Sequence, residues 1–238
     1  MSDDDTTLRL GGMALRNGLL VHGPSSWAAA VRLADGSIAV ASGRKPRLPA
    51  SLLRVPFARG VGRVAEAMAL SVAAQTALRR SRVSPARAEL LAALAAMVPS
   101  ALALRSGDLA GYHGAEHKTI GAYETGEASA ATSKEHERCG SHLIAPLLAG
   151  TAAAQALAAR APAEHRVAAR AAGSLAALGM AVEVFGWMDR NRGSRLARVL
   201  EQPGFALQRA LATSEPDARQ LEVADKALEA LLTAERAA

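Results

Sequence analysis

The chain has 238 residues, enough for one large domain or for a core domain with appendages. Half of the residues are apolar but only 3% are aromatic, and alanine is the commonest apolar residue, so we expect a mainly helical protein. The net charge of +6 is compatible with an anionic lipid, nucleic acid or anionic substrate, and the single cysteine, Cys139, excludes an intrachain disulfide.

Changes in composition along the chain predict four regions. Residues 1–10 are expected to form a loose acidic start, in which Met1–Thr7 are acidic and polar and lack the features of a signal peptide. They are followed by a small β region with a basic connector (11–56), a helical core (57–200) and a C-terminal amphipathic helix region (201–238). The expected fold class is α+β, a mainly helical bundle with a small N-terminal β-hairpin region.

The β region is predicted from turn residues and strand-forming runs. Trp27–Leu33 and Ile38–Ala41 flank Asp35-Gly36, a dipeptide that favours a tight hairpin turn. Met13–His22 has the composition of one further strand. The basic stretch that follows is interrupted by prolines, which indicates a connector.

Four apolar segments predict helices. They are Val61–Leu78, Leu90–Leu104, Leu143–Ala159 and Val167–Met188. A last, amphipathic helix is predicted after Ser214, which we interpret as its N-cap because an acid follows three residues later.

The apolar segments raise the question of a membrane. Leu90–Leu104 and Leu143–Ala159 are uncharged runs of 15 and 17 residues, whereas a spanning helix needs about 20. Helical hairpins that dip into or lie against a membrane and a soluble helical bundle both fit these lengths. Glu183 lies inside another apolar segment, and we expect it to face inward, beside an arginine such as Arg63 or toward a metal site.

The stretch Tyr112–Lys118 carries the strongest chemical signal. In a helix, His113 and His117 project from one face, so both imidazoles can bind one metal ion. Glu116 directly precedes His117 and is placed to take a proton from water. The pattern His-x-x-Glu-His is known from the inverzincin proteases, but it is short, and two polar histidines on a solvated helix face are the alternative interpretation.

A second candidate pair follows a polar loop. Gly126 is expected to end the first helix, and Thr132 with Glu135 forms a capping box for a short helix that carries His136 and Cys139 on one face. His-x-x-Cys is a suitable ligand pair for zinc. A lone cysteine is also often a buried apolar residue, which is the alternative here.

The two pairs together predict a shared metal site. One helix turn supplies only two imidazoles, so further ligands must come from another segment. The loop Gly126–Ala131 is long enough to fold His136 and Cys139 back toward His113 and His117, with Cys139 as a thiolate. The sequence therefore predicts that these four side chains converge on one divalent cation of the zinc type.

Three blocks around these residues resemble the signature of the YqhQ-like family. They are Tyr-His-Gly-Ala-Glu-His-Lys-Thr-Ile at Tyr112–Ile120, Tyr123-Glu124-x-Gly126 and His136-x-Arg138-Cys139-Gly140. Shorter similarities begin at Gly11, Pro56 and Pro203. This bacterial and plastid family has no known function and is described as predicted to be metal-dependent and membrane-associated. The resemblance implies a membrane location and a metal, and it implies no reaction.

Two positions depart from the family pattern. The first block of the family carries an acid where this chain has Asn17, so the resemblance implies no role for that position. His142 does not belong to the pattern, and its candidacy as a ligand rests on spacing alone.

The first functional hypothesis is a membrane-associated metal-dependent hydrolase. Glu116 would act as general base, and Lys118 or Arg138 would hold an anionic substrate. Tyr123 and Glu124 are further candidates for binding substrate or supporting the ligands, although Glu124 is too far along the helix to share a metal with His117. Membrane lipid is the expected partner, with the motif loop on the cytoplasmic side.

Two other classes of function are compatible with the sequence. One is a non-catalytic membrane scaffold whose metal, if present, is structural and closed by four protein ligands. The other is a basic module that binds nucleic acid or the ribosome, which ranks last because stacking aromatic residues are scarce and no recognition motif is found. The sequence predicts neither the substrate nor the oligomeric state.

Overall fold

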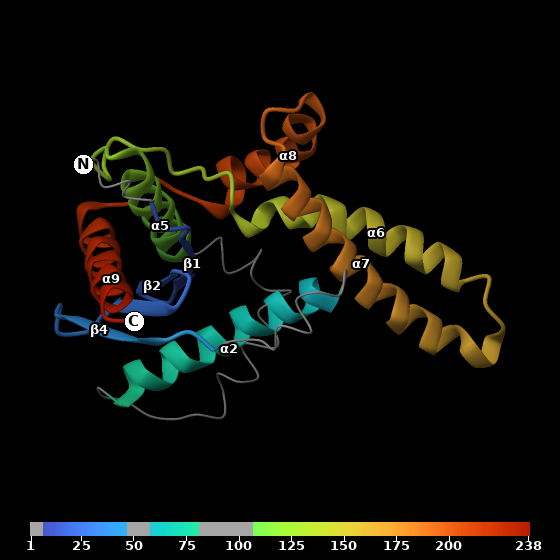
Figure 1. Ribbon diagram of the computed structural model, residues 1–238, viewed down its shortest axis with the longest axis horizontal. Coiled ribbons are helices and arrows are strands. Elements are labelled where there is room, and N and C mark those ends of the chain that lie inside the picture. The colour runs from blue at the N-terminus through green and yellow to red at the C-terminus, as the bar shows by residue number, and fades with distance from the viewer. Residues whose placement is uncertain (1–6, 47–57, 81–106) are drawn as a thin grey trace. The chain divides into compact units, whose positions relative to one another are not determined.

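The computed structural model describes residues 7–46, 58–80 and 107–238. Helices and a small antiparallel sheet make up these residues (Figure 1), which confirms the α+β, mainly helical class. The chain divides into two compact units. Of the described residues, 7–45, 70–80, 107–136 and 209–238 belong to the first unit, and 46, 58–69 and 137–208 belong to the second. The predicted helix at Leu90–Leu104 lies outside the described residues.

The sheet of the first unit is a four-stranded antiparallel meander. Its strands, in spatial as well as chain order, are β1 (Gly11–Leu15), β2 (Gly18–His22), β3 (Ser26–Arg32) and β4 (Ile38–Arg44). The predicted hairpin around Asp35-Gly36 is confirmed, with Gly36 at a φ of 84°. The single strand predicted at Met13–His22 is wrong. The chain turns back at Asn17, whose φ of 59° is a left-handed conformation that asparagine adopts more readily than most residues.

Both faces of the sheet are covered by helices of the same unit. Because side chains alternate along a strand, Leu19 and Val21 of β2 face one side and Leu20 faces the other. The first side packs against α5 (Gly107–Thr125) and α9 (Ala218–Arg236). The second packs against the part of α2 (Ala58–Arg80) that carries Leu70 and Ala74. The sheet is therefore buried on both sides and forms the core of this unit.

The last helix, α9, begins later than predicted. Asp217, and not Ser214, is its N-cap, and Gln220 completes the capping box. Pro216 explains the difference, because a proline disfavours helical conformation in the residue before it. The chain from Thr213 to Pro216 is neither helix nor strand, and Ser214 N donates a hydrogen bond to Ala110 O.

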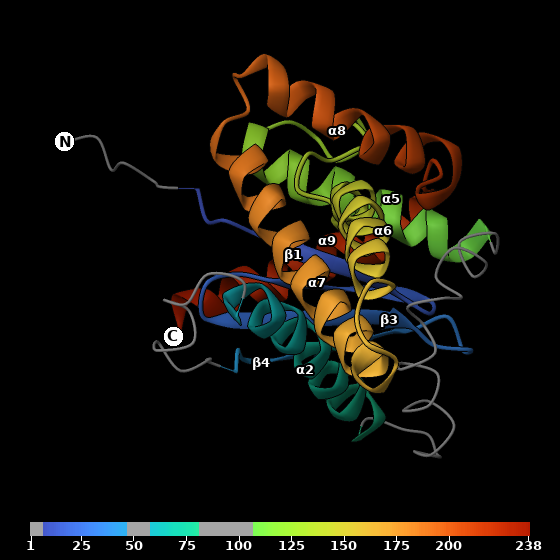
Figure 2. The same ribbon diagram turned by 90° about the vertical axis from the view of Figure 1, so that its right-hand side faces the viewer.

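The second unit contains an antiparallel helical hairpin. The elements are the short helix η1 (Gly140–Leu143), α6 (Ile144–Ala158), the short helix η2 (Ala163–His165), α7 (Arg166–Arg190) and α8 (Arg195–Leu207) (Figure 2). The helices predicted at Leu143–Ala159 and Val167–Met188 are confirmed as α6 and α7.

Small residues hold α6 and α7 close together. Each helix carries a glycine followed four residues later by an alanine, and each glycine faces the alanine of the other helix. A Cβ atom at Gly150 would lie 3.3 Å from that of Ala177, and one at Gly173 would lie 2.9 Å from that of Ala154. This reciprocal arrangement resembles the small-residue interfaces of helices that pack in membranes.

The outward surface of this hairpin is apolar. Within the part of the chain that the structure describes, two segments, 140–158 and 163–190, are long and apolar enough to cross a membrane. Only 17% and 22% of an 18-residue apolar stretch within each segment is buried, and Leu148 on α6 and Leu175 on α7 are 65% and 58% exposed. Glu183 on α7 is half-buried, and its pairing with Arg63 stays a prediction, as does the side of the membrane on which the motif loop lies.

Candidate metal site

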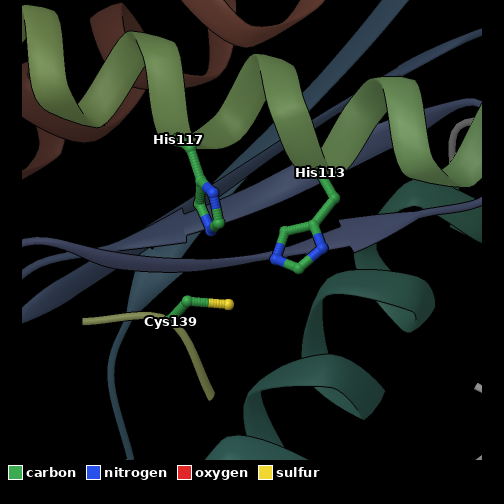
Figure 3. A group of neighbouring side chains, drawn as sticks. All are labelled: His113, His117 and Cys139. Carbon is green, nitrogen blue, oxygen red and sulfur yellow. The ribbon is translucent and has the colours of Figure 1, made fainter. Parts of the chain in front are cut away.

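The helix α5 presents the two motif histidines on one side. Gly126 ends the helix with a φ of 75°, as predicted. Tyr112 and Ile120 pack in the core with the sheet, which fixes the rotation of the helix about its axis. His113 and His117 then project from the same face, with ring centroids 4.4 Å apart and the rings edge to face (Figure 3).

Backbone carbonyls orient both imidazoles. The Nδ1 atom of His113 lies 2.8 Å from Ala212 O, and that of His117 lies 2.7 Å from Lys134 O. A carbonyl oxygen can only accept, so Nδ1 carries the proton in each ring and Nε2 is the nitrogen with a lone pair. Histidines that bind metals are commonly held in this way, with the second ring nitrogen donating to a carbonyl or carboxylate.

Gly114, in the middle of the motif, allows the segment that bears Ala212 to approach. A Cβ atom at position 114 would lie only 2.2 Å from Ser214 O, so any side chain would displace that backbone. Ser214 is also tied to the helix by its bond to Ala110 O. The glycine between the two histidines is therefore required by the close crossing that places a carbonyl beside His113.

Cys139 supplies a third candidate ligand. One atom from each of His113, His117 and Cys139 lies within 4.8 Å of the others (Figure 3). Cys139 is buried and caps η1, with its sulfur accepting from Ser141 N at 3.5 Å. Burial raises the pKa of the Cys139 thiol, and the hydrogen bond from Ser141 opposes this in part. A cation would have to displace the thiol proton in order to bind the sulfur.

His136 lies beside the grouped donors His113, His117 and Cys139 but does not belong to that group. Its ring centroid is 5.6 Å from that of His117, and its Nε2 is 3.2 Å from Glu124 Oε2. The short helix predicted to carry it is wrong, because the described residues 126–139 contain no helix. The hydroxyl of Thr132, the expected cap, lies 2.7 Å from Lys118 O and supports the loop against α5. His136 and Cys139 are nevertheless close in space, since only two residues separate them.

Glu116, the predicted general base, is buried against strand β1. Its carboxylate lies next to Gly12, where an added Cβ atom would be 2.7 Å from Oε1 and 2.8 Å from Leu20 O. Only 4% of Glu116 is exposed, and it is not among the three grouped ligands. Sequence reasoning missed Gly12 as part of this arrangement, although the similarity that begins at Gly11 covers it.

Lys118 holds the polar loop. Its ammonium group donates to Thr132 O at 2.8 Å and to Ala130 O at 3.3 Å, and it forms an ion pair with Glu215 at 2.6 Å. The lysine is 5% exposed. These contacts hold the polar loop and Glu215 against α5. The binding of an anionic substrate by Lys118 stays a prediction.

The other predicted site residues lie in different surroundings. The hydroxyl of Tyr123 accepts from Leu8 N at 3.2 Å, and Arg138 is half-buried beside Cys139 in the chain. Their roles in binding substrate or supporting the ligands stay predictions.

His142 belongs to a separate buried network in the second unit. Its Nδ1 is 3.1 Å from Glu201 O and its Nε2 is 3.2 Å from the side-chain nitrogen of Gln208, which also donates to Ser141 at 2.9 Å. Gly204 leaves room for the ring, because a Cβ atom there would lie 2.1 Å from Nδ1. The similarity to the YqhQ-like family that begins at Pro203 extends through Gln208. A single glutamine in an apolar region carries no spacing signal, so its contact with His142 was not predicted.

We predict that Gly12 and Glu116 are energetically coupled. Gly12→Ala should lower the free energy of unfolding less in a Glu116→Ala background than in the wild-type chain, by about 0.5–3 kcal/mol. The reason is that the close contacts of the added methyl group with Oε1 and Cδ of Glu116 disappear, and only that with Leu20 O remains. Thermal or denaturant unfolding of the four proteins measures the coupling. Strict additivity would show that the carboxylate does not rest on Gly12.

The comparisons with known proteins identify a family. The profile of the family described as "Protein of unknown function (DUF1385)" matches residues 107–234, more than half of the chain, including α5, the loop with His136 and Cys139, and α9. Comparisons with curated proteins and with solved structures found no match. The YqhQ-like resemblance agrees with this match. The chain therefore belongs to the DUF1385 family of proteins of unknown function.

Proposed function

We propose that this protein is a membrane-associated, metal-dependent hydrolase whose cation of the zinc type is held by His113, His117 and Cys139. The observation that carries the proposal is the grouping of these three donors, with both imidazoles oriented by carbonyl groups. Two imidazoles and one thiolate are a ligand set that suits zinc. Ligand atoms of a zinc site lie within about 4 Å of one another, so the observed spread of 4.8 Å requires only small side-chain adjustments.

Three protein ligands are the number found in catalytic zinc sites, which keep a fourth position for water or substrate. A zinc-type cation supplies Lewis acidity and activates water for hydrolysis. In this proposal the chain contributes the remaining functions. Ala212 O and Lys134 O hold the imidazoles in place, and Glu116, adjacent in the helix to His117, accepts a proton from the attacking water.

The position of His136 supports the scaffold alternative. Its ring lies 5.6 Å from that of His117, so release from Glu124 would allow it to serve as a fourth protein ligand. Four protein ligands would close the site and make the metal structural. The two candidate functions therefore differ in whether His136 is needed for metal binding.

The membrane association that we propose rests on the α6–α7 hairpin. Its two helices pack against each other through glycine and alanine. Their outward-facing leucines are exposed, and a surrounding lipid phase would remove this apolar surface from water. Segments 140–158 and 163–190 have the length for a bilayer core of about 30 Å.

We predict one zinc-type ion per chain. Elemental analysis of protein loaded with Zn²⁺ and desalted should find the metal in the wild-type chain and in His165→Ala, a control that removes an exposed histidine. His117→Ala and Cys139→Ser should weaken binding by more than the about 10–100-fold that loss of a ligand's outer partner costs. His136→Ala should keep the metal if the site is open and lose it if the metal is structural. Equal metal content in His117→Ala, Cys139→Ser and wild type would contradict the site, and circular dichroism checks that each variant is folded.

We predict that hydrolysis depends on both the metal and Glu116. Glu116→Gln should keep the metal and lower the rate on activated carboxylate and phosphate esters by about 10²–10⁴-fold, because the proton acceptor is lost. Glu164→Gln is the matched control, since Glu164 is exposed on η2. Activity that survives complete removal of the metal would contradict metal-dependent hydrolysis. It would not contradict the binding of a metal at this site.

We predict that the hairpin anchors the protein. Leu175→Arg should sharply reduce the fraction of protein that resists alkaline extraction from membranes, because an arginine at the centre of a spanning helix costs about 3 kcal/mol. Val40→Arg, on the edge strand β4, changes an exposed apolar residue outside the hairpin and should have no effect. Full extraction of the wild-type protein would contradict membrane anchoring.

A further inference from the structure

The helix α8 has two faces of different character. Its inner face buries Ala197, Glu201 and Gly204. Its outer face exposes an apolar stripe that we define as Leu196, Val199, Pro203 and Ala206. The spacing of three, four and three residues keeps these four on one side of the helix, and Leu196 and Val199 are 57% and 65% exposed.

The charges on the outer face of α8 are all positive. Arg195 and Arg198 are exposed, and helix geometry places both along one edge of the apolar stripe. The acid of the helix, Glu201, is only 8% exposed and turns to the inside. Nearby Arg192 is neutralised by its ion pairs with Glu137 and Asp189. The outer face therefore combines an apolar stripe with two arginines and no exposed carboxylate.

The stripe continues into a groove between α8 and the end of α7. The groove has a volume of about 410 Å³, and its α7 wall consists of Glu183, Val184, Trp187 and Arg190. Leu196 belongs to both the stripe and the groove. Tryptophan and arginine at the end of a span-length helix are the residues that anchor such helices at the level of lipid headgroups. The helix α8 begins only five residues beyond Arg190, so it starts at the same level.

We propose that α8 lies flat in the surface of an anionic membrane, with the apolar stripe among the acyl chains and Arg195 and Arg198 at the lipid phosphates. This inference rests on the proposed membrane association of the α6–α7 hairpin. It adds α8 as the element whose binding depends on the charge of the lipid. It also assigns an orientation, in which the C-terminal end of α7 lies at the anionic leaflet. Arginines beside a narrow apolar stripe are typical of interfacial helices, and their charge favours anionic lipid over a neutral surface.

The test uses the full chain with Cys139 kept in place, because this single cysteine is buried. The chain without an added cysteine, treated with the same label, is the control for reaction at Cys139. An environment-sensitive fluorophore is attached at Val199→Cys on α8 or at Leu175→Cys on α7. Each protein is reconstituted in vesicles of phosphatidylcholine alone or mixed with phosphatidylglycerol, and quenching by lipids that carry a quencher in the acyl chain is measured. We expect the Leu175 label to be quenched in both lipids and the Val199 label mainly in the anionic one.

Charge variants test the role of the arginines. Arg195→Gln with Arg198→Gln should lower the preference of α8 for anionic over neutral vesicles by about 25-fold, as measured with the Val199 label. The reason is that each arginine at an anionic surface raises the binding constant about fivefold. The matched control, Arg166→Gln with Arg170→Gln, removes two exposed arginines near the start of α7 and should leave the signal unchanged.

The outcomes separate the two proposals. A Leu175 label in lipid with a Val199 label in water would overturn the α8 proposal and keep membrane association. Both labels in water would overturn both. A Val199 label that is shielded from water but not quenched by lipid would show a protein contact, and equal quenching in neutral and anionic vesicles would remove the charge preference. Either result would overturn the α8 proposal.

Discussion

The burial of α5 against the sheet and against α9 is the constraint on which the candidate site depends. Tyr112, Ala115 and Ile120 must face the core that Leu19 and Val21 contribute to from the sheet. Once these residues are buried, the rotation of the helix is set. His113 and His117 can then project only from one side, where Ala212 O and Lys134 O orient their rings.

Much of the long motif on α5 serves this packing as well as chemistry. Gly114 admits the backbone at Ser214, Lys118 holds the polar loop, and the buried hydroxyl of Thr119 lies 3.2 Å from Asp225 Oδ1 of α9. Buried polar groups of this kind are costly unless each finds a partner. The motif therefore describes a folded arrangement of helix, loop and α9, which explains why so many neighbouring positions take part in it.

The two units differ in where they place their large apolar side chains. In the first, the sheet is covered on both faces, so residues such as Leu20 and Trp27 are shielded by protein. In the second, glycine and alanine occupy the interface of α6 and α7, while larger residues such as Leu148 point outward. Small residues at the helix interface with large apolar residues on the outside are unfavourable in water. The same arrangement is expected where acyl chains surround the helices.

Local sequence determined several features of this protein by itself. The Asp35-Gly36 hairpin, the end of α5 at Gly126 and the helical apolar segments follow from conformational preferences of a few adjacent residues. The pairing of His113 and His117 also follows, because helix geometry alone places them on one face. Only the tertiary structure decided that Cys139 joins them, that His136 turns to Glu124, and that Glu116 rests on Gly12. These relations depend on the path of an irregular loop and on contacts across more than a hundred residues, which no local preference encodes.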